Sequence, residues 1–160
     1  MSILFSMAKT YKPGFGQKMA NKLLTSQLRK GRGPGFMRLL TVHGRKTGEP
    51  YSTPVVPVGS VDDDDGHWLV SPFGEVGWVR NVRATGQVTL TRGESQTFTA
   101  TELAPADAAP VLRRYLGLKP ASRFVKAYFD VRPDSSDDAF AAEAPRHPVF
   151  ALTSVSPGSS

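Results

Sequence analysis

The segment His43–Pro54, HGRKTGEPYSTP, holds the residues best suited to bind an anion. Two adjacent cations, Arg45 and Lys46, lie between two glycines, and short apolar runs flank the segment. A tight turn of this composition presents backbone N–H groups beside a guanidinium fork and an ammonium group, a combination that suits a phosphate. A solvated hairpin tip would have the same composition, so these residues alone leave both interpretations open.

A second segment, Ser71–Asn81 with the sequence SPFGEVGWVRN, is suited to a flat ring. An apolar run ends in Ser-Pro-Phe-Gly, and a helix is predicted to begin near Trp78. A heteroaromatic ring could hydrogen-bond to the exposed backbone, and the N-terminus of the helix favours negative charge. The alternative is a core tryptophan that anchors a strand-to-helix connection.

Other reactive groups are scarce. The chain has no cysteine, which excludes disulfides, thiolate metal sites and thiol nucleophiles. His43, His67 and His147 have no ligand spacing, and we assign them no role. The acidic run at 62–66, DDDDG, lacks the spacing of an EF-hand and is interpreted as a solvated turn. No metal site is predicted.

Positive charge is concentrated in the first part of the chain. Residues 1–50 contain ten Lys or Arg and the single acid Glu49, whereas the remainder has ten cations and thirteen acids. This asymmetry suggests a phosphorylated or polycarboxylate small molecule, an acidic membrane surface or a nucleic acid as partner. Nucleic acid is disfavoured, because the cations gather on a helix and a turn and do not alternate with aromatic residues.

The element that carries much of this charge is a predicted amphipathic helix at Gly14–Lys30. Its leucine stripe could pack on the rest of the protein, which we favour, or lie on an anionic bilayer. No secretory signal or membrane-spanning stretch is seen, so we expect a cytoplasmic protein. Peripheral association at the inner face of the cell membrane is the alternative.

Six short strands must position the two segments. They are predicted at Phe36–Val42, Tyr51–Val58, His67–Ser71, Gln87–Thr91, Ser95–Glu102 and Val149–Val155. Pro54 and Pro57 cannot donate to a ladder, so the second strand is expected at an edge or with a bulge. Strands that follow one another mostly as hairpins favour a small antiparallel barrel over a βαβ array.

Short helices complete the predicted fold, which is mainly β with an α+β character. They are predicted at Trp78–Thr85 with Gly86 as the C-cap, at Ala106–Leu116 and at Ser122–Asp130, and Asp134–Pro148 is expected to be a loop or a short helical lid. We expect residues 1–35 to form the helix and a linker, residues 36–156 the barrel, and residues 157–160 a disordered tail.

The two segments together resemble the deazaflavin-dependent nitroreductase family of actinobacteria. The resemblance lies in LLTVHGRKTGEPYSTPV and LVSPFGEVGWVRNVRATGQVTL, is close over Phe36–Thr101 and extends weakly to Val155. Its motifs are a GRKTG turn, a strand that ends in Ser and a W-x-x-N-x-x-A helix. It implies the split β-barrel of pyridoxamine-phosphate-oxidase and FMN-binding-like proteins and coenzyme F420 as cofactor, with FMN as the alternative.

The resemblance also implies the site residues. The turn would hold the cofactor's phosphate, the next strand would run beside its chain and ring, the Ser-x-x-Gly segment would meet the deazaflavin ring, and the helix would support the pocket. In that order, the residues are Arg45, Lys46, Thr47 and Gly48; Thr53, Pro54, Val55 and Val56; Ser71, Pro72, Phe73 and Gly74; and Trp78, Arg80 and Asn81.

The activity implied is hydride transfer from C5 of reduced F420 to an activated alkene, quinone or nitro compound, with a proton from Tyr128, Ser71 or water. The alternative is a non-catalytic protein that binds or stores F420.

Three departures argue against assuming nitroimidazole reduction: Tyr51 stands where family members have a basic residue, the loop before Trp78 is shorter, and the late tyrosines are not reproduced. The partner is a small-molecule electron acceptor, and the oligomeric state stays open.

Overall fold

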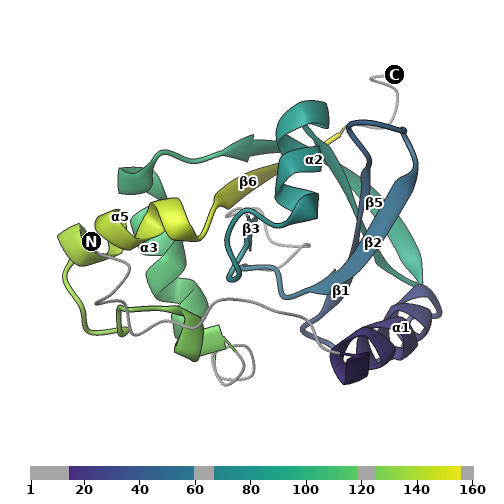
Figure 1. Ribbon diagram of the computed structural model, residues 1–160, viewed down its shortest axis with the longest axis horizontal. Coiled ribbons are helices and arrows are strands. Elements are labelled where there is room, and N and C mark those ends of the chain that lie inside the picture. Colours follow the sequence, from purple (N-terminus) through teal and green to yellow (C-terminus); the bar gives the residue numbers. More distant parts are fainter. Residues whose placement is uncertain (1–14, 60–66, 119–124, 156–160) are drawn as a thin grey trace.

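The computed structural model of the chain describes residues 15–59, 67–118 and 125–155, and Figure 1 shows its elements. The strands are β1 (Arg38–His43), β2 (Pro50–Val55), β3 (His67–Val70), β4 (Gln87–Arg92), β5 (Glu94–Glu102) and β6 (Val149–Ser154). The helices are α1 (Phe15–Arg29), α2 (Gly77–Thr85), α3 (Pro105–Leu116) and α5 (Asp137–Glu143), with two 3-10 helices, η2 (Lys126–Tyr128) and η3 (Ala144–Arg146).

All six strands form one antiparallel sheet in the order β2-β1-β4-β5-β6-β3. Just beyond β2, Val58 exchanges two backbone hydrogen bonds with Trp68 of β3, with N···O distances of 2.8 and 2.9 Å. The two edges of the sheet therefore meet at this point, and the sheet curls into the predicted split antiparallel β-barrel.

The edge position predicted for the proline-containing strand is confirmed. β2 is the first strand of the sheet, and its Pro54 lies opposite Leu39 of β1. A proline is tolerated there because no further strand needs its missing N–H group.

Alternating side chains of the strands fill the barrel. The buried members of this core are Leu40, Val42, Leu69, Val79, Val82, Val88, Leu90, Phe98, Ala100, Phe150 and Leu152. Two of them, Val79 and Val82, come from α2, so this helix is fixed by the same core as the strands. α2 ends at Gly86, which has φ of 71° and donates its N–H to the Val82 carbonyl at 2.7 Å, as predicted for a glycine C-cap.

A second core joins the barrel to α3 and α5. Val58, Val70 and Val149 contribute from the barrel side, and Leu112 and Phe140 contribute from the two helices. In Figure 1, α3 and α5 lie together on one side of the barrel and α1 lies on the other. This second core covers the outer surface of the barrel next to β3.

In its described part, the helix predicted at Ser122–Asp130 is wrong only in its length: Val125 is α-helical, but the helical backbone stops after Tyr128. Lys126–Tyr128 is a single 3-10 turn, and Phe129 has extended backbone with φ of −115° and ψ of 139°. Phe129 and Val131 are both buried, and extended backbone lets residues two apart point into one core. Residues 119–124, the acidic run at 62–66 and the tail at 157–160 lie outside the described residues.

The stretch Asp134–Pro148, predicted to be either a loop or a short helical lid, is helical over most of its length. α5 begins after Ser136, whose hydroxyl accepts a hydrogen bond from the Ala139 N–H group at 3.1 Å. This is an N-cap, and Asp137 and Asp138 complement the positive end of the helix.

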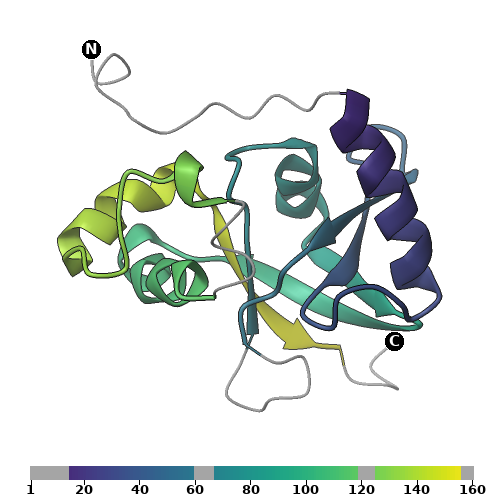
Figure 2. The ribbon, with the colours of Figure 1, turned by 90° about the horizontal axis from the view of Figure 1, so that it is seen from below.

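α1 packs against β2, β1 and β4, and Figure 2 shows it beside these strands. Leu28 is fully buried, while Leu23 is 64% exposed. The Arg92 guanidinium donates hydrogen bonds to the carbonyl oxygens of Arg32, Gly33 and Pro34 at 3.3, 2.9 and 2.8 Å. The segment after α1 is thereby fixed to the β4–β5 hairpin.

Candidate cofactor-binding site

The GRKTG turn closes the β1–β2 hairpin. The Gly44 N–H donates to the Glu49 carbonyl at 2.7 Å, and the Gly48 N–H donates to the Gly44 carbonyl at 2.9 Å. The four predicted phosphate-binding residues are all exposed at this tip: Arg45, Lys46, Thr47 and Gly48. A Cβ atom at Gly44 would lie 2.7 Å from Cε2 of Tyr51, so a larger residue there would require the tyrosine ring to move away from the turn.

A buried asparagine connects the turn to α2. Asn81 Oδ1 accepts hydrogen bonds from the backbone N–H of Arg45 at 3.1 Å and from its Nη1 at 2.8 Å. The two residues are 36 positions apart. Asn81 is only 6% exposed, so its amide is held by α2 and holds the turn in a fixed place.

Arg45 and Lys46 have no carboxylate partner among the residues that the structure describes. Only Nη1 of the Arg45 guanidinium is used by Asn81, and a guanidinium carries five N–H donors. The remaining donors can bind an oxyanion, and the nearby lysine adds a second positive charge.

The one carboxylate in the loop before α2 is neutralised. Arg83 donates to Glu75 at 2.9 Å and forms a double hydrogen bond with Glu102, at 2.8 Å for each contact. The hydrogen bond from Arg83, and then its charge, lower the pKa of the exposed Glu75 carboxyl, and the two carboxylates raise the pKa of Arg83. Glu75 is therefore ionised and paired, which reduces its repulsion of an anion near α2.

The predicted ring-binding segment forms a tight turn between β3 and α2. The Ser71 N–H donates to the Pro148 carbonyl at 2.9 Å, and the Ser71 hydroxyl donates to the Gly74 carbonyl at 2.5 Å. Because a hydroxyl has one proton, Ser71 has no second proton to donate in this conformation. Tyr128 is therefore the stronger of the two predicted proton donors.

Tyr128 lies against this segment although it is 55 positions away from Phe73. The two rings meet edge to face, with centroids 4.8 Å apart and an interplanar angle of 77°. Tyr128 is half-buried, and its hydroxyl has no hydrogen-bond partner among the described residues. An aromatic wall with a polar end thus lies beside the Ser-Pro-Phe-Gly turn.

The other predicted residues are divided between the two cores. Val55 and Trp78 pack against the barrel core, where the Trp78 ring lies 5.9 Å from that of Phe150. Val56 packs against the second core, as do Phe73 and Tyr128. Thr53 and Pro54 are half-buried on β2, and Arg80 is exposed on α2.

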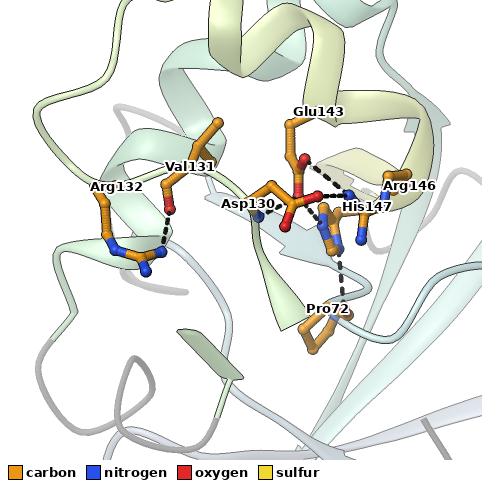
Figure 3. A network of polar contacts seen from close by, with 7 residues as sticks. All are labelled: Pro72, Asp130, Val131, Arg132, Glu143, Arg146 and His147. Atoms are coloured by element: carbon orange, nitrogen blue, oxygen red, sulfur yellow. Dashed lines mark hydrogen bonds and ion pairs between the residues drawn. The ribbon is translucent and has the colours of Figure 1, made fainter. Parts of the chain in front are cut away.

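Sequence reasoning missed a buried network behind the turn, which Figure 3 shows. His147 lies 2.8 Å from the Pro72 carbonyl oxygen through Nδ1 and 2.7 Å from Glu143 Oε2 through Nε2. Glu143 Oε2 also accepts the Asp130 N–H at 3.1 Å. The spacing of Glu143 and His147, four positions apart where a helix was possible, was the available signal.

Comparison with known proteins fits this arrangement. The sequence matches the family model of F420H(2)-dependent quinone reductase over residues 20–128, which is more than half of the chain. The chain belongs to this family. It is accordingly an F420H2-dependent reductase, and F420 is the cofactor that family membership implies. A search of curated proteins found no match to the chain.

Solved structures similar to this quinone reductase family member support the fold. One is an F420-H2 dependent reductase, FDR-A, with a TM-score of 0.51, 18% identity and coverage of 74% of this chain and 95% of that chain. Another, described as a domain-swapped dimer, has a TM-score of 0.54 and 16% identity, covering 87% of this chain and 97% of that chain. A protein of unknown function from Agrobacterium tumefaciens has a TM-score of 0.50 and 14% identity, covering 94% of this chain and 62% of that chain.

The donors present in this family member suit F420. Its phosphodiester and carboxylate tail need cations without competing acids, which Arg45 and Lys46 provide at an exposed turn. Its flat ring needs an aromatic surface to pack against, which the Phe73–Tyr128 pair beside the Ser71–Gly74 turn provides.

Removing the side chain of Asn81 is expected to loosen the turn. Asn81→Ala takes away the acceptor of two Arg45 donors, each hydrogen bond being worth about 1 kcal/mol, so F420 affinity should fall roughly tenfold. Fluorescence titration with F420 measures this loss. Ala84→Ser, an exposed change on the same helix, is the control and should leave affinity unchanged. Equal affinities for Asn81→Ala and the wild type would show that Asn81 does not position Arg45.

Proposed function

We propose that this reductase transfers a hydride from reduced F420 to a quinone or another activated alkene, with nitro compounds as further acceptors. The observation that carries the proposal is the Arg45–Asn81 contact, because it places two cations without carboxylate partners beside the helix that follows the Ser-Pro-Phe-Gly turn. A phosphate-binding point and a ring-binding surface on either side of one helix suit a phosphorylated ring cofactor.

The residues of the chain have distinct tasks in this proposal. Arg45 and Lys46 bind the phosphodiester, and the backbone of Ser71–Gly74 orients the ring. F420, when bound in its reduced form, supplies the hydride from C5. Phe73 and Tyr128 exclude water and accept a flat apolar compound against their rings.

The Tyr128 hydroxyl is proposed as the proton donor. Two-electron reduction of a quinone needs one hydride and one proton to give the neutral hydroquinone, and the hydroxyl can supply that proton to the carbonyl oxygen. Tyr128 regains a proton from water, to which its half-exposed position gives access.

Equilibrium titration of the protein with F420, FMN and FAD tests the cofactor assignment. We expect F420 to bind most tightly, because the tail of F420 carries more negative charge for the cationic turn. Turnover is then followed by the absorbance and fluorescence of reduced F420 with menadione or an enone as acceptor. Binding without turnover would favour the alternative of a non-catalytic F420-binding or storage protein, and tighter binding of FMN would overturn the cofactor assignment.

Peripheral binding to an anionic membrane through α1 is a second proposal. The observation that favours it is Leu23, which is 64% exposed on α1 beside Lys22, with Lys30 directly after the helix. No helix in the described part of the chain is long and apolar enough to cross a bilayer.

Substitution on α1 tests the membrane proposal. The Leu23→Asp variant should no longer sediment with vesicles of phosphatidylglycerol and phosphatidylcholine, and F420 binding should be unchanged. Ser26→Asp, also exposed on α1, adds the same charge without removing an apolar side chain and should keep more of the vesicle binding. Failure of the wild-type protein to sediment with these vesicles would contradict the proposal.

A further inference from the structure

The ring-binding turn at Ser71–Gly74 is contacted by a buried pair of side chains, His147 and Glu143, that the proposed reaction does not use. His147 is 2% exposed and Glu143 is 5% exposed, and together they link η3 and α5 to the backbone of Pro72. The Phe129 ring stacks on the imidazole, with centroids 3.7 Å apart and an angle of 12°. The imidazole is therefore fixed on one face by Phe129 and at both of its nitrogens.

Hydrogen-bond chemistry determines the protons in this pair. The Pro72 carbonyl oxygen only accepts, so Nδ1 of His147 must carry a proton at the 2.8 Å contact. A second proton must lie between Nε2 and Glu143 Oε2, which are 2.7 Å apart. Glu143 already accepts the Asp130 N–H and lies 3.3 Å from Nη1 of Arg146, which favours the carboxylate form. His147 therefore donates through Nδ1 to Pro72 and shares the second proton with Glu143 through Nε2.

The turn has further anchors around Pro72. Ser71 is held by Pro148 through its N–H and by Gly74 through its hydroxyl, and the Val76 N–H donates to the Gly74 carbonyl at 2.9 Å. His147 supplies the contact from outside the turn that fixes the peptide between Pro72 and Phe73. Rotation of this peptide would redirect the adjacent backbone and move the Phe73 ring away from Tyr128.

We propose that His147 and Glu143 are positioning residues for hydride transfer, because they fix the Pro72 carbonyl and with it the backbone that meets the cofactor ring. The inference rests on the proposed function, in which Ser71–Gly74 orients the ring. Affinity should depend mainly on the cationic turn, so the pair should affect turnover more than binding. The pair does not touch the reacting atoms.

Two substitutions at His147 separate its two contacts. The amide nitrogen of Asn falls near the position of Nδ1, so His147→Asn can keep the hydrogen bond to Pro72. The amide of Gln falls near Nε2, so His147→Gln keeps a contact to Glu143 and loses Pro72. Since small displacements of a bound reactant slow reactions strongly, we expect kcat to fall about tenfold in His147→Gln and less than about threefold in His147→Asn.

The dissociation constant for oxidised F420 should change less than about threefold in both variants, because the cationic turn that supplies the charged contacts is intact. Hydrogen exchange of the protein without F420 provides a second, independent measurement. Hydrogen exchange of the amides at 73–76 should be faster in His147→Gln than in the wild type and close to wild type in His147→Asn. Glu143→Gln should also speed this exchange, since it replaces the carboxylate that holds Nε2 of the imidazole.

These outcomes distinguish the inference from the proposed function. If the wild-type protein does not bind F420, the proposed function fails, and hydrogen exchange still tests whether His147 holds the turn. If F420 binds and both His147 variants keep wild-type kcat, the positioning role is refuted. Equal losses of kcat in both variants, with equal losses of thermal stability, would also refute it, because they would indicate support of the fold without control of Pro72.

Discussion

Replacing Arg45 and Lys46 together by alanine is expected to weaken F420 binding about 100-fold or more. Each charge-assisted hydrogen bond to a phosphate contributes about 1.5–3 kcal/mol, and the double variant loses at least two of them. Neither side chain has an ion-pair partner among the described residues, so their removal leaves no described carboxylate without its counter-charge. Fluorescence titration at fixed ionic strength measures the effect.

A matched control is the Lys22→Ala/Lys30→Ala variant, which removes one exposed cation from α1 and one directly after it and so changes the net charge equally. Its affinity should stay close to that of the wild type. If both double variants weaken binding to the same degree, general electrostatic attraction explains the effect. The cationic turn would then have no specific role, and the proposed phosphate site would be wrong.

Tyr128→Phe is expected to lower kcat by about 100-fold with menadione as acceptor, because a positioned proton donor contributes about 10²–10⁴-fold. Binding of F420 should be unchanged, since the variant keeps the ring that packs on Phe73 with centroids 4.8 Å apart. Single-turnover oxidation of reduced F420 measures the chemical step directly. A solvent deuterium isotope effect on this step should be present in the wild type.

Two further variants, one at Tyr128 and one at Ser71, show which group causes the loss of kcat. Tyr128→Ala removes the ring as well and should weaken the apparent affinity for menadione in addition to lowering kcat. Ser71→Ala removes the hydroxyl that donates to Gly74 and should lower thermal stability with a smaller effect on the chemical step. If Tyr128→Phe retains wild-type kcat while Ser71→Ala loses it, the proton donor has been misassigned.

The local elements of the fold could be predicted from the sequence. Alternation of apolar and polar residues is visible without coordinates, and it located the strands that became β4 and β5. Pro54 indicated an edge strand and Gly86 a helix C-cap, because each residue restricts its own backbone. The helix predicted at Ser122–Asp130 failed where burial of Phe129 and Val131 outweighed helical spacing.

The candidate site could be predicted only as separate segments. Charge and turn composition singled out Arg45 and Lys46, and the resemblance named Asn81, but nothing local indicated that Asn81 would accept two donors from Arg45, 36 positions away. Tyr128 was placed near the ring by resemblance alone, and its contact with Phe73 comes from packing in the second core.

The sequence by itself determined most of the secondary structure, the cationic turn and the family. Only the tertiary structure decided which polar groups meet: the Ser71 hydroxyl turns to Gly74, and His147 reaches Pro72, 75 positions earlier in the chain. The physical reason is that periodicity and turn chemistry act over a few residues. A buried donor takes whichever acceptor the closed barrel and the second core bring within about 3 Å.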